Sequence, residues 1–154
     1  MPKLTGQKFA VALDIDKSET RDLGPLNDCG WTVLEPRHVA GDPWRYREFI
    51  QASKAEFMVA KSIVVETNSG WFSDRTMCYL ASGKPALVQD TGLARLYPIG
   101  EGLLTFRTPD EAAAGVEEIC ANYDRHCRAA REIAEAYFDS DKVLARLLDM
   151  LGVA

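Results

Sequence analysis

The chain lacks the residues and spacings of a metal-binding protein. It has only two histidines, His38 and His126, and its four cysteines show no CxxC spacing. Zinc sites need clustered Cys and His ligands, so we expect no metal. We expect His126, which lies between charged residues, on the surface. We expect the cysteines to be small, reduced core residues, because free cysteine is usually buried; they are Cys29, Cys78, Cys120 and Cys127.

Long apolar runs and an excess of positive charge are absent as well. No segment reaches the roughly 18 apolar residues typical of a membrane-spanning helix, and no cationic and then apolar leader opens the chain. The formal net charge is −5, which gives no attraction to nucleic acid or to anionic membranes. We therefore expect a cytoplasmic protein with no nucleic-acid partner and no integral membrane contact.

Several motifs of nucleotide-binding proteins and hydrolases are also missing, including GxSxG, the Walker loop and GxGxxG. Asp14 and Asp16 follow an apolar run and are similar to the aspartate pair of haloacid-dehalogenase-type phosphatases. That motif expects Thr or Val at the position of Ser18. Solvation of a strand end is the alternative interpretation of this pair, and it is the one we favour.

The chain does contain alternating apolar strands and helices. Its length of 154 residues suits one domain over residues 1–154. Short apolar runs predict strands, the first of them covered on both faces. Their ranges are 8–15, 31–35, 56–60 with an extension through 62–65, 85–89 and 102–106. Such alternation gives parallel sheets with right-handed crossovers.

Helix signals separate these strands. Residues 18–28 read as a short helix or turn interrupted by Pro25. Asp42 caps a helix with Trp44, Phe49 and Ile50 as candidate buried positions, and residues 73–82 form another that stops at Gly83. Thr108 and Glu111 form a capping box that opens one long helix to about residue 137, followed by an amphipathic helix over 143–151.

These elements predict an α/β fold: a single Rossmann-like, three-layer αβα domain with a mainly parallel sheet of about five strands and a long C-terminal helical segment. In such sheets, ligands bind at the carboxyl ends of strands, beside helix N-termini. The polar loop 68–75 and the loop after residue 89 are two such ends, close together in sequence. They therefore indicate where a phosphate-bearing ligand would bind.

The helix start near residue 73 has the chemistry of an anion site. It offers free N–H groups and the positive end of a helix dipole. Around it stand the hydroxyls of Ser69, Ser73 and Thr76, the forked cation of Arg75 and the small Gly70. The alternative is ordinary capping, in which Ser73 or Asp74 completes the helix and Arg75 is solvated.

Two further polar loops flank the next strand. Residues 89–92 follow it, and residues 98–102 lead into the strand after it. The carboxylate of Asp90 or Glu101 suits hydroxyls of a sugar or ribose, and Gly92, Gly100 and Gly102 allow close approach of the backbone. Plain turns are the alternative interpretation of both loops.

Taken together, these segments resemble the C-terminal, nucleotide-sugar-binding domain of GT-B glycosyltransferases. The resemblance covers roughly residues 5–150 and rests on an ordered set of segments: AEFMVAK (55–61), SGWFSDR (69–75), YLASGKP (79–85), QDTG (89–92), PIGEGL (98–103) and FDS (138–140). More narrowly, SGWFSDR with YLASGKP and QDTG is similar to bacterial proteins labelled glycosyltransferases.

The resemblance implies a substrate and a set of contacts. It places the diphosphate of an NDP-sugar at the helix start, with Ser69, Gly70, Ser73, Asp74 and Arg75. It assigns contacts to the sugar or its neighbouring loops to Asp90, Thr91, Gly92, Gly100, Glu101 and Gly102. The nucleotide sugar is then a substrate, and no cofactor is implied.

The chain departs from this family in two ways. Many retaining members carry two glutamates eight residues apart around this helix, where this chain has Gly70 and Cys78. Ribose binding by the second glutamate and a retaining mechanism therefore stay open, and no catalytic residue is assigned. A GT-B enzyme has two Rossmann-like domains, and this chain has residues for one. We therefore expect no sugar transfer without an N-terminal acceptor domain or partner chain. A non-catalytic nucleotide-binding or regulatory module is the alternative, and a homodimer stays open.

Overall fold

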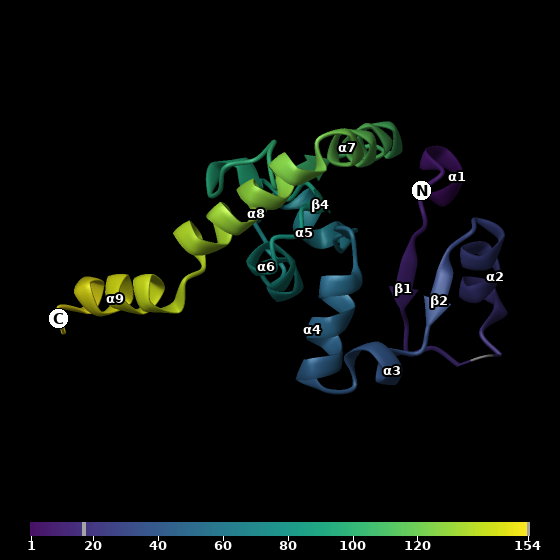
Figure 1. Ribbon diagram of the computed structural model, residues 1–154, viewed down its shortest axis with the longest axis horizontal. Helices are drawn as coiled ribbons and strands as arrows, with labels where there is room; N and C mark the ends of the chain where they lie inside the picture. The colour runs from purple at the N-terminus through teal and green to yellow at the C-terminus, as the bar shows by residue number, and fades with distance from the viewer. Residues whose placement is uncertain (17, 154) are drawn as a thin grey trace.

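The structure is a computed structural model that describes residues 1–16 and 18–153. Its described residues form five strands that pair in parallel, in two sheets (Figure 1). β1 (Ala10–Ala12) pairs with β2 (Thr32–Leu34). β4 (Ala86–Gln89) lies between β3 (Glu56–Met58) and β5 (Leu103–Phe106). The predicted Rossmann-like α/β fold is confirmed, with its strands divided between a two-stranded and a three-stranded sheet.

Side chains rather than backbone connect the two sheets. The ring centroid of Phe57 lies 5.4 Å from that of Phe9 and 6.1 Å from that of Trp31. Across the described ranges, no backbone ladder joins β1 to β3. Val11 in β1 is only half-buried and Ala10 is exposed, so the expectation of a strand covered on both faces was wrong. An apolar run shows which residues are extended, but it does not show which strand edges pair.

The three-stranded sheet is the middle of a three-layer core. On one face, Met58, Ala86, Val88 and Leu103 pack against Leu80 of α6 (Asp74–Ala81) and against α8 (Tyr123–Tyr137) through Ala130, Ile133 and Ala134. On the other face, Leu87, Leu104 and Phe106 pack against α7 (Pro109–Ala121) through Ala112 and Ile119. Successive residues of a strand face opposite sides of the sheet, so β4 and β5 contribute to both clusters.

Shorter helices connect these layers and occupy the N-terminal part. They are α1 (Pro2–Thr5), α2 (Thr20–Asp28), α3 (Pro36–Ala40), α4 (Pro43–Ala52), α5 (Ser62–Glu66) and the 3₁₀ turn η1 (Leu93–Arg95). The predicted cap of α4 is confirmed, since Asp42 accepts hydrogen bonds from the N–H groups of Trp44 and Arg45, each at 3.0 Å. Thr108 likewise accepts from Glu111 N at 3.2 Å, but the Glu111 carboxylate bonds to Arg107 N instead of completing the box at Thr108.

Four local expectations differ from the structure. The extension over 62–65 is helix α5, in which the N–H groups of Val64 and Val65 donate to the Lys61 carbonyl. α2 continues through Pro25. The long helix is two helices, α7 and α8, that meet at Asn122, where φ is −123° and ψ is 37°. Trp44 is 70% exposed, because α4 turns that side toward solvent, whereas Ile50 is buried as predicted.

The cysteines are free but do not form a core. Cys29 and Cys78 are exposed, while Cys120 and Cys127 are half-buried and lie on different helices, α7 and α8. Cys29 directly follows α2 and the other three lie on helices, so none of the four belongs to the two apolar clusters.

The final amphipathic helix is confirmed as α9 (Ser140–Leu151), which extends away from the three-layer body (Figure 1). Its apolar residues are exposed, among them Leu144 at 56% and Leu147 at 50%. Of the helices that the structure describes, none combines the length and the apolar character needed to cross a membrane.

Candidate functional site

The first turn of α6 follows the loop that leaves β3, as the sequence predicted. Ser73 is the N-cap, and its hydroxyl accepts from Arg75 N at 3.3 Å. The Asp74 carboxylate accepts from the same N–H at 2.9 Å and lies at the positive end of the helix dipole. Ser73 is 3% exposed. Ser73 and Asp74 therefore cap α6 through the N–H of Arg75.

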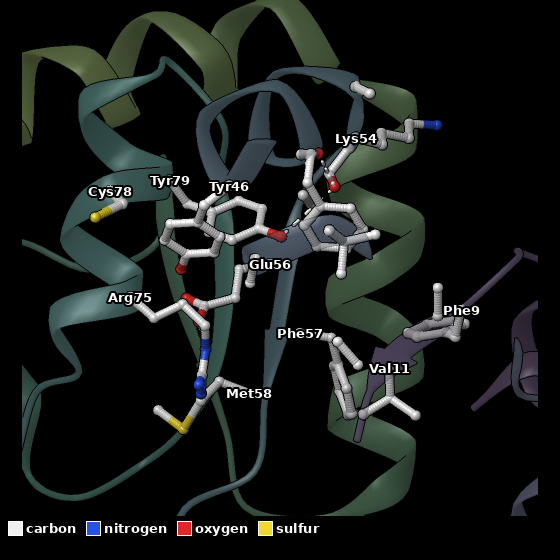
Figure 2. A pocket seen from close by; sticks show the side chains of 18 of the residues that line it. Phe9, Val11, Tyr46, Lys54, Glu56, Phe57, Met58, Arg75, Cys78 and Tyr79 are labelled. Atoms are coloured by element: carbon white, nitrogen blue, oxygen red, sulfur yellow. Dashed lines mark hydrogen bonds and ion pairs between the residues drawn. The ribbon is translucent and has the colours of Figure 1, made fainter. Parts of the chain in front are cut away.

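Arg75 is held by a buried carboxylate that the sequence did not indicate. Its Nε donates to Glu56 Oε1 at 3.0 Å, and the side chains are 52% and 4% exposed, respectively (Figure 2). Burial raises the pKa of Glu56 above its usual value, and the hydrogen bond and charge of Arg75 oppose that rise. The bond to Glu56 uses Nε of Arg75, and the arginine side chain stays partly exposed. In the sequence, the one sign of this role is that Glu56 is a charged residue at the start of an otherwise apolar strand.

Backbone bonds join the loops that follow β3 and β4. Gly70 N donates to the Thr91 carbonyl at 2.6 Å, and the Thr91 hydroxyl donates to the Trp71 carbonyl at 2.7 Å. Ser69 accepts from Trp71 N at 3.3 Å. Thr91 is fully buried, so its hydroxyl contacts the loop of Trp71 and not a ligand. The two strand ends that are close in sequence are therefore also close in space.

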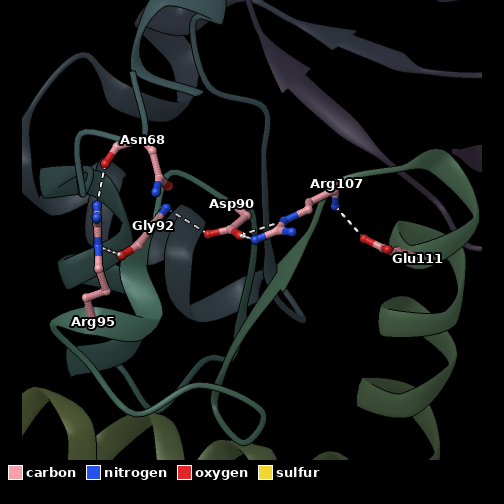
Figure 3. Close-up of polar contacts among 6 residues, drawn as sticks. All are labelled: Asn68, Asp90, Gly92, Arg95, Arg107 and Glu111. Atoms are coloured by element: carbon pink, nitrogen blue, oxygen red, sulfur yellow. Dashed lines mark hydrogen bonds and ion pairs between the residues drawn. The ribbon is translucent and has the colours of Figure 1, made fainter. Parts of the chain in front are cut away.

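Gly92 is required by close packing in the same loop. Its φ is +91°, and a Cβ there would lie 2.6 Å from Arg95 Nη2 and would also overlap the Asn68 side chain. Arg95 donates to the carbonyls of Asn68 and Gly92 (Figure 3). The glycine thus lets an arginine tie the loop after β3 to the loop after β4.

Asp90 is also already bonded. Its Oδ1 accepts from Gly92 N at 2.8 Å, and its Oδ2 accepts from Arg107 Nε and Nη2 at 2.9 and 2.7 Å (Figure 3). Burial works against the charged form, but these hydrogen bonds and the charge of Arg107 hold the pKa of Asp90 below its usual value. Arg107 directly follows β5, and its position at a strand end is the one sign of this role in the sequence.

We expect Asp90→Asn to lower stability at neutral pH by about 1 kcal/mol, because the amide keeps an acceptor for Gly92 N and loses the charged partner of Arg107, whose side chain is exposed. The pKa of Asp90 is lower in the folded chain than in the unfolded one, where it is about 4. Its contribution is therefore present above that pH and is lost as the pH falls through the folded pKa.

Urea unfolding of both proteins between pH 3 and 7 measures this effect. Asp28→Asn, at an exposed aspartate on α2, is the control and should change stability by less than about 0.5 kcal/mol. A difference between Asp90→Asn and wild type that stays constant over this pH range would contradict the assignment.

The third predicted loop lies at the other edge of the sheet. Ala86 N, at the start of β4, donates to the Gly102 carbonyl at 2.8 Å, so Gly102 stands at the amino ends of the strands. Glu101 is exposed and pairs with Arg125 at 3.7 Å. Gly100, Glu101 and Gly102 therefore do not gather with Asp90, Thr91 and Gly92, because the connection from β4 to β5 crosses the whole sheet.

His126 lies in the interior of the protein. It is 0% exposed, and its Nδ1 accepts from Gly102 N at 3.1 Å while its Nε2 faces Glu118 Oε1 at 3.3 Å. The expectation of a surface residue was wrong because α8 turns this position onto the loop before β5. His38 is exposed on α3.

A large cavity separates the two sheets, and the sequence did not predict it. It has a volume of about 1330 Å³, and residues from β1, α4, β3, α6 and α7 line it. Glu56, Tyr46, Tyr79 and Cys78 gather on its α6 side, and Phe57 faces Val11 on the other (Figure 2). Asp74 and Arg75 also line it. The first turn of α6 therefore borders both the strand-end loops and the cavity.

In the part of the chain that the structure describes, no three His, Cys, Asp or Glu side chains gather as metal ligands would. The Asp16 carboxylate accepts from the N–H and hydroxyl of Ser18 at 2.8 and 2.6 Å. Both bonds are local and exposed, which agrees with the interpretation that Asp16 is a solvated residue after the strand.

Comparison with known proteins gives the family. A model described as "Glycosyl transferase-like" matches residues 9–149. Searches of curated proteins and of solved structures gave no match. The match spans both sheets, the first turn of α6 and most of α9. Since it covers far more than half of the sequence, the chain belongs to the glycosyl transferase-like family.

Proposed function

We propose that this chain binds the nucleotide-sugar donor of a glycosyltransferase. The observation that carries the proposal is Arg75, which Glu56 holds by Nε at 3.0 Å beside the N-terminus of α6. A guanidinium fixed at one nitrogen can present its other two as a fork to a phosphate oxygen pair. Family membership supplies the sugar-related substrate class.

The diphosphate in this proposal lies at the first turn of α6. Arg75 contacts it directly, and the N–H groups of the helix start other than that of Arg75 complete the site. Gly70 donates its N–H to Thr91 and belongs to the loop that borders this turn. Ser73 and Asp74 cap this turn, and Ser69 holds the loop before it by accepting from Trp71 N. A carboxylate such as Asp74 would repel phosphate, so its role here is to orient the turn.

The loop after β4 forms the other wall of the proposed donor site. Thr91 bonds to Gly70 and Trp71, and Asp90 accepts from Gly92 N within the same loop. Gly100, Glu101 and Gly102 take no part, because they stand at the opposite edge of the sheet. We propose that sugar transfer requires an acceptor-binding domain as well, and we assign no catalytic residue.

Arg75→Ala is expected to weaken the binding of UDP and GDP by about tenfold or more, because a charge-assisted fork to phosphate is lost. Uridine and guanosine, which have no phosphate, should bind as before. Isothermal titration calorimetry of all four ligands measures both effects. Arg128→Ala, at an exposed arginine on α8, is the control.

Equal losses for nucleosides and nucleoside diphosphates would show that Arg75 does not bind the diphosphate. A second measurement tests donor binding itself. A ligand that binds only the folded chain raises its melting temperature. We expect UDP-sugars or GDP-sugars at millimolar concentration to do so, and no shift with any of them would count against the proposal.

A further inference from the structure

Helix α9 presents a row of exposed leucines at the spacing i, i+3, i+4 and i+7. This leucine row consists of Leu144, Leu147, Leu148 and Leu151. None of the twelve residues of α9, all of which the structure describes, is buried. A helix of about 12–15 residues is marginally stable alone in water, and most helices depend on packing of their apolar face. The leucine row therefore needs a surface to pack against.

A groove on the body of the same chain offers such a surface. It has a volume of about 490 Å³, and α8 and the segment 98–101 form its walls. Its lining combines apolar side chains with two carboxylates: Pro98, Ile99, Ile133, Tyr137, Glu101 and Glu132. Amphipathic helices dock in apolar grooves through anchors at the spacing of the leucine row. α9 extends away from the body (Figure 1) and, among the described residues, gives no side chain to the groove of its own chain.

The accessible surface of the chain is larger than that of a compact monomer. It amounts to 9871 Å² for a mass of 17.1 kDa, whereas a compact monomer of this mass has roughly 7,800 Å². The exposed helix α9 and the cavity between the sheets both contribute to this excess. A standard interface removes about 800 Å² from each partner. The excess of roughly 2,000 Å² is therefore large enough for a stable dimer.

We propose that α9 of each chain lies in the groove of a second copy, so that two chains form a symmetric dimer. Helix and groove belong to one chain, and a two-fold axis then covers both pairs at once. Tyr137 ends α8 and lines the groove, so each α9 would lie beside the start of its partner. The charges of α9 favour this partner over a membrane, because two acidic and two basic residues balance: Asp141, Asp149, Lys142 and Arg146. Helices that lie on membranes are rich in Lys and Arg.

Sedimentation velocity of the full chain between about 1 and 100 μM tests the proposal, since interfaces of standard size bind at micromolar affinity or better. We expect a mass of twice 17.1 kDa. Leu148→Asp would bury a charge in the interface and should raise the dimer dissociation constant by about tenfold or more. Arg146→Asp is the matched control. It introduces the same residue in α9, two positions before Leu148 and on the other side of the helix, and should change the constant by less than about threefold.

A variant of the groove tests the other half of the interface. Ile99 is exposed and lines the groove, so Ile99→Asp changes the groove and leaves α9 intact. It should also raise the dissociation constant by about tenfold or more. Both substituted side chains are exposed in the single chain, and circular dichroism checks that each variant is folded.

Three results would overturn the inference. The first is a chain that stays monomeric over the whole concentration range. The second is a dimer that Leu148→Asp weakens and Ile99→Asp does not, since α9 would then pair outside the groove, or a dimer that survives both variants. The third is a monomer that floats with vesicles of phosphatidylcholine and phosphatidylserine and loses this binding in Leu148→Asp, because a membrane would then cover the leucine row.

Discussion

Replacing Gly102 with alanine is expected to destabilise the chain by roughly 2–5 kcal/mol, because two costs add at one position. The φ of Gly102 is +73°, a region that side chains rarely adopt. A Cβ there would stand 2.7 Å from the Ala129 carbonyl carbon and the Ala130 Cα, which belong to the backbone of α8. A helix backbone cannot rotate away as a side chain can. The melting temperature should fall by about 5–15 °C.

Gly100→Ala is the matched control. Its φ is +108°, but no atom lies within 4 Å of the position of its Cβ. Only backbone strain is then expected, about 1–2 kcal/mol. Thermal and urea unfolding of both variants separate strain from contact with α8. Equal losses would mean that α8 does not pack against Gly102 as the structure shows.

His126→Ala should destabilise the chain by about 2–4 kcal/mol, which is the second large effect. The substitution leaves the buried Gly102 N–H without the acceptor Nδ1, at a cost of about 1–3 kcal/mol. It also removes a fully buried ring from the contact between α8 and the loop before β5, which leaves a void. Urea unfolding at pH 7 measures the change.

Two variants show whether the hydrogen bond or the volume dominates. His126→Asn supplies an amide oxygen near the position of Nδ1 and should recover part of the loss. His38→Ala removes the exposed histidine of α3 and should change stability by less than about 0.5 kcal/mol. Equal effects of His126→Ala and His38→Ala would contradict the burial of His126.

Much of the fold was predictable because its signals are local. The cap at Asp42, the stop after residue 82 and the apolar runs of β4 and β5 each depend on neighbours within a few residues. α5 and the break at Asn122 were not predictable in this way. The apolar residues of 62–65 are compatible with either strand or helix, and tertiary contacts decide between them.

The candidate site was predictable in its position and not in its contacts. The sequence correctly placed Ser73 and Arg75 at a helix start beside the strand-end loop of Asp90. It did not show that Glu56, 19 residues before Arg75, would hold that arginine. An ion pair between a strand and a helix depends on how the two pack, which no local pattern encodes.

The sequence by itself determined the α/β class, the parallel strands, the helix start at Ser73 and the likeness to glycosyltransferases. These follow from periodicity, caps and motif order, all of which are properties of short segments. Only the tertiary structure decided that the strands form two sheets with a cavity between them, that Gly100–Gly102 lie away from Asp90, and that His126 is buried. Each of these depends on which distant surfaces pack together, and packing is a property of the whole chain.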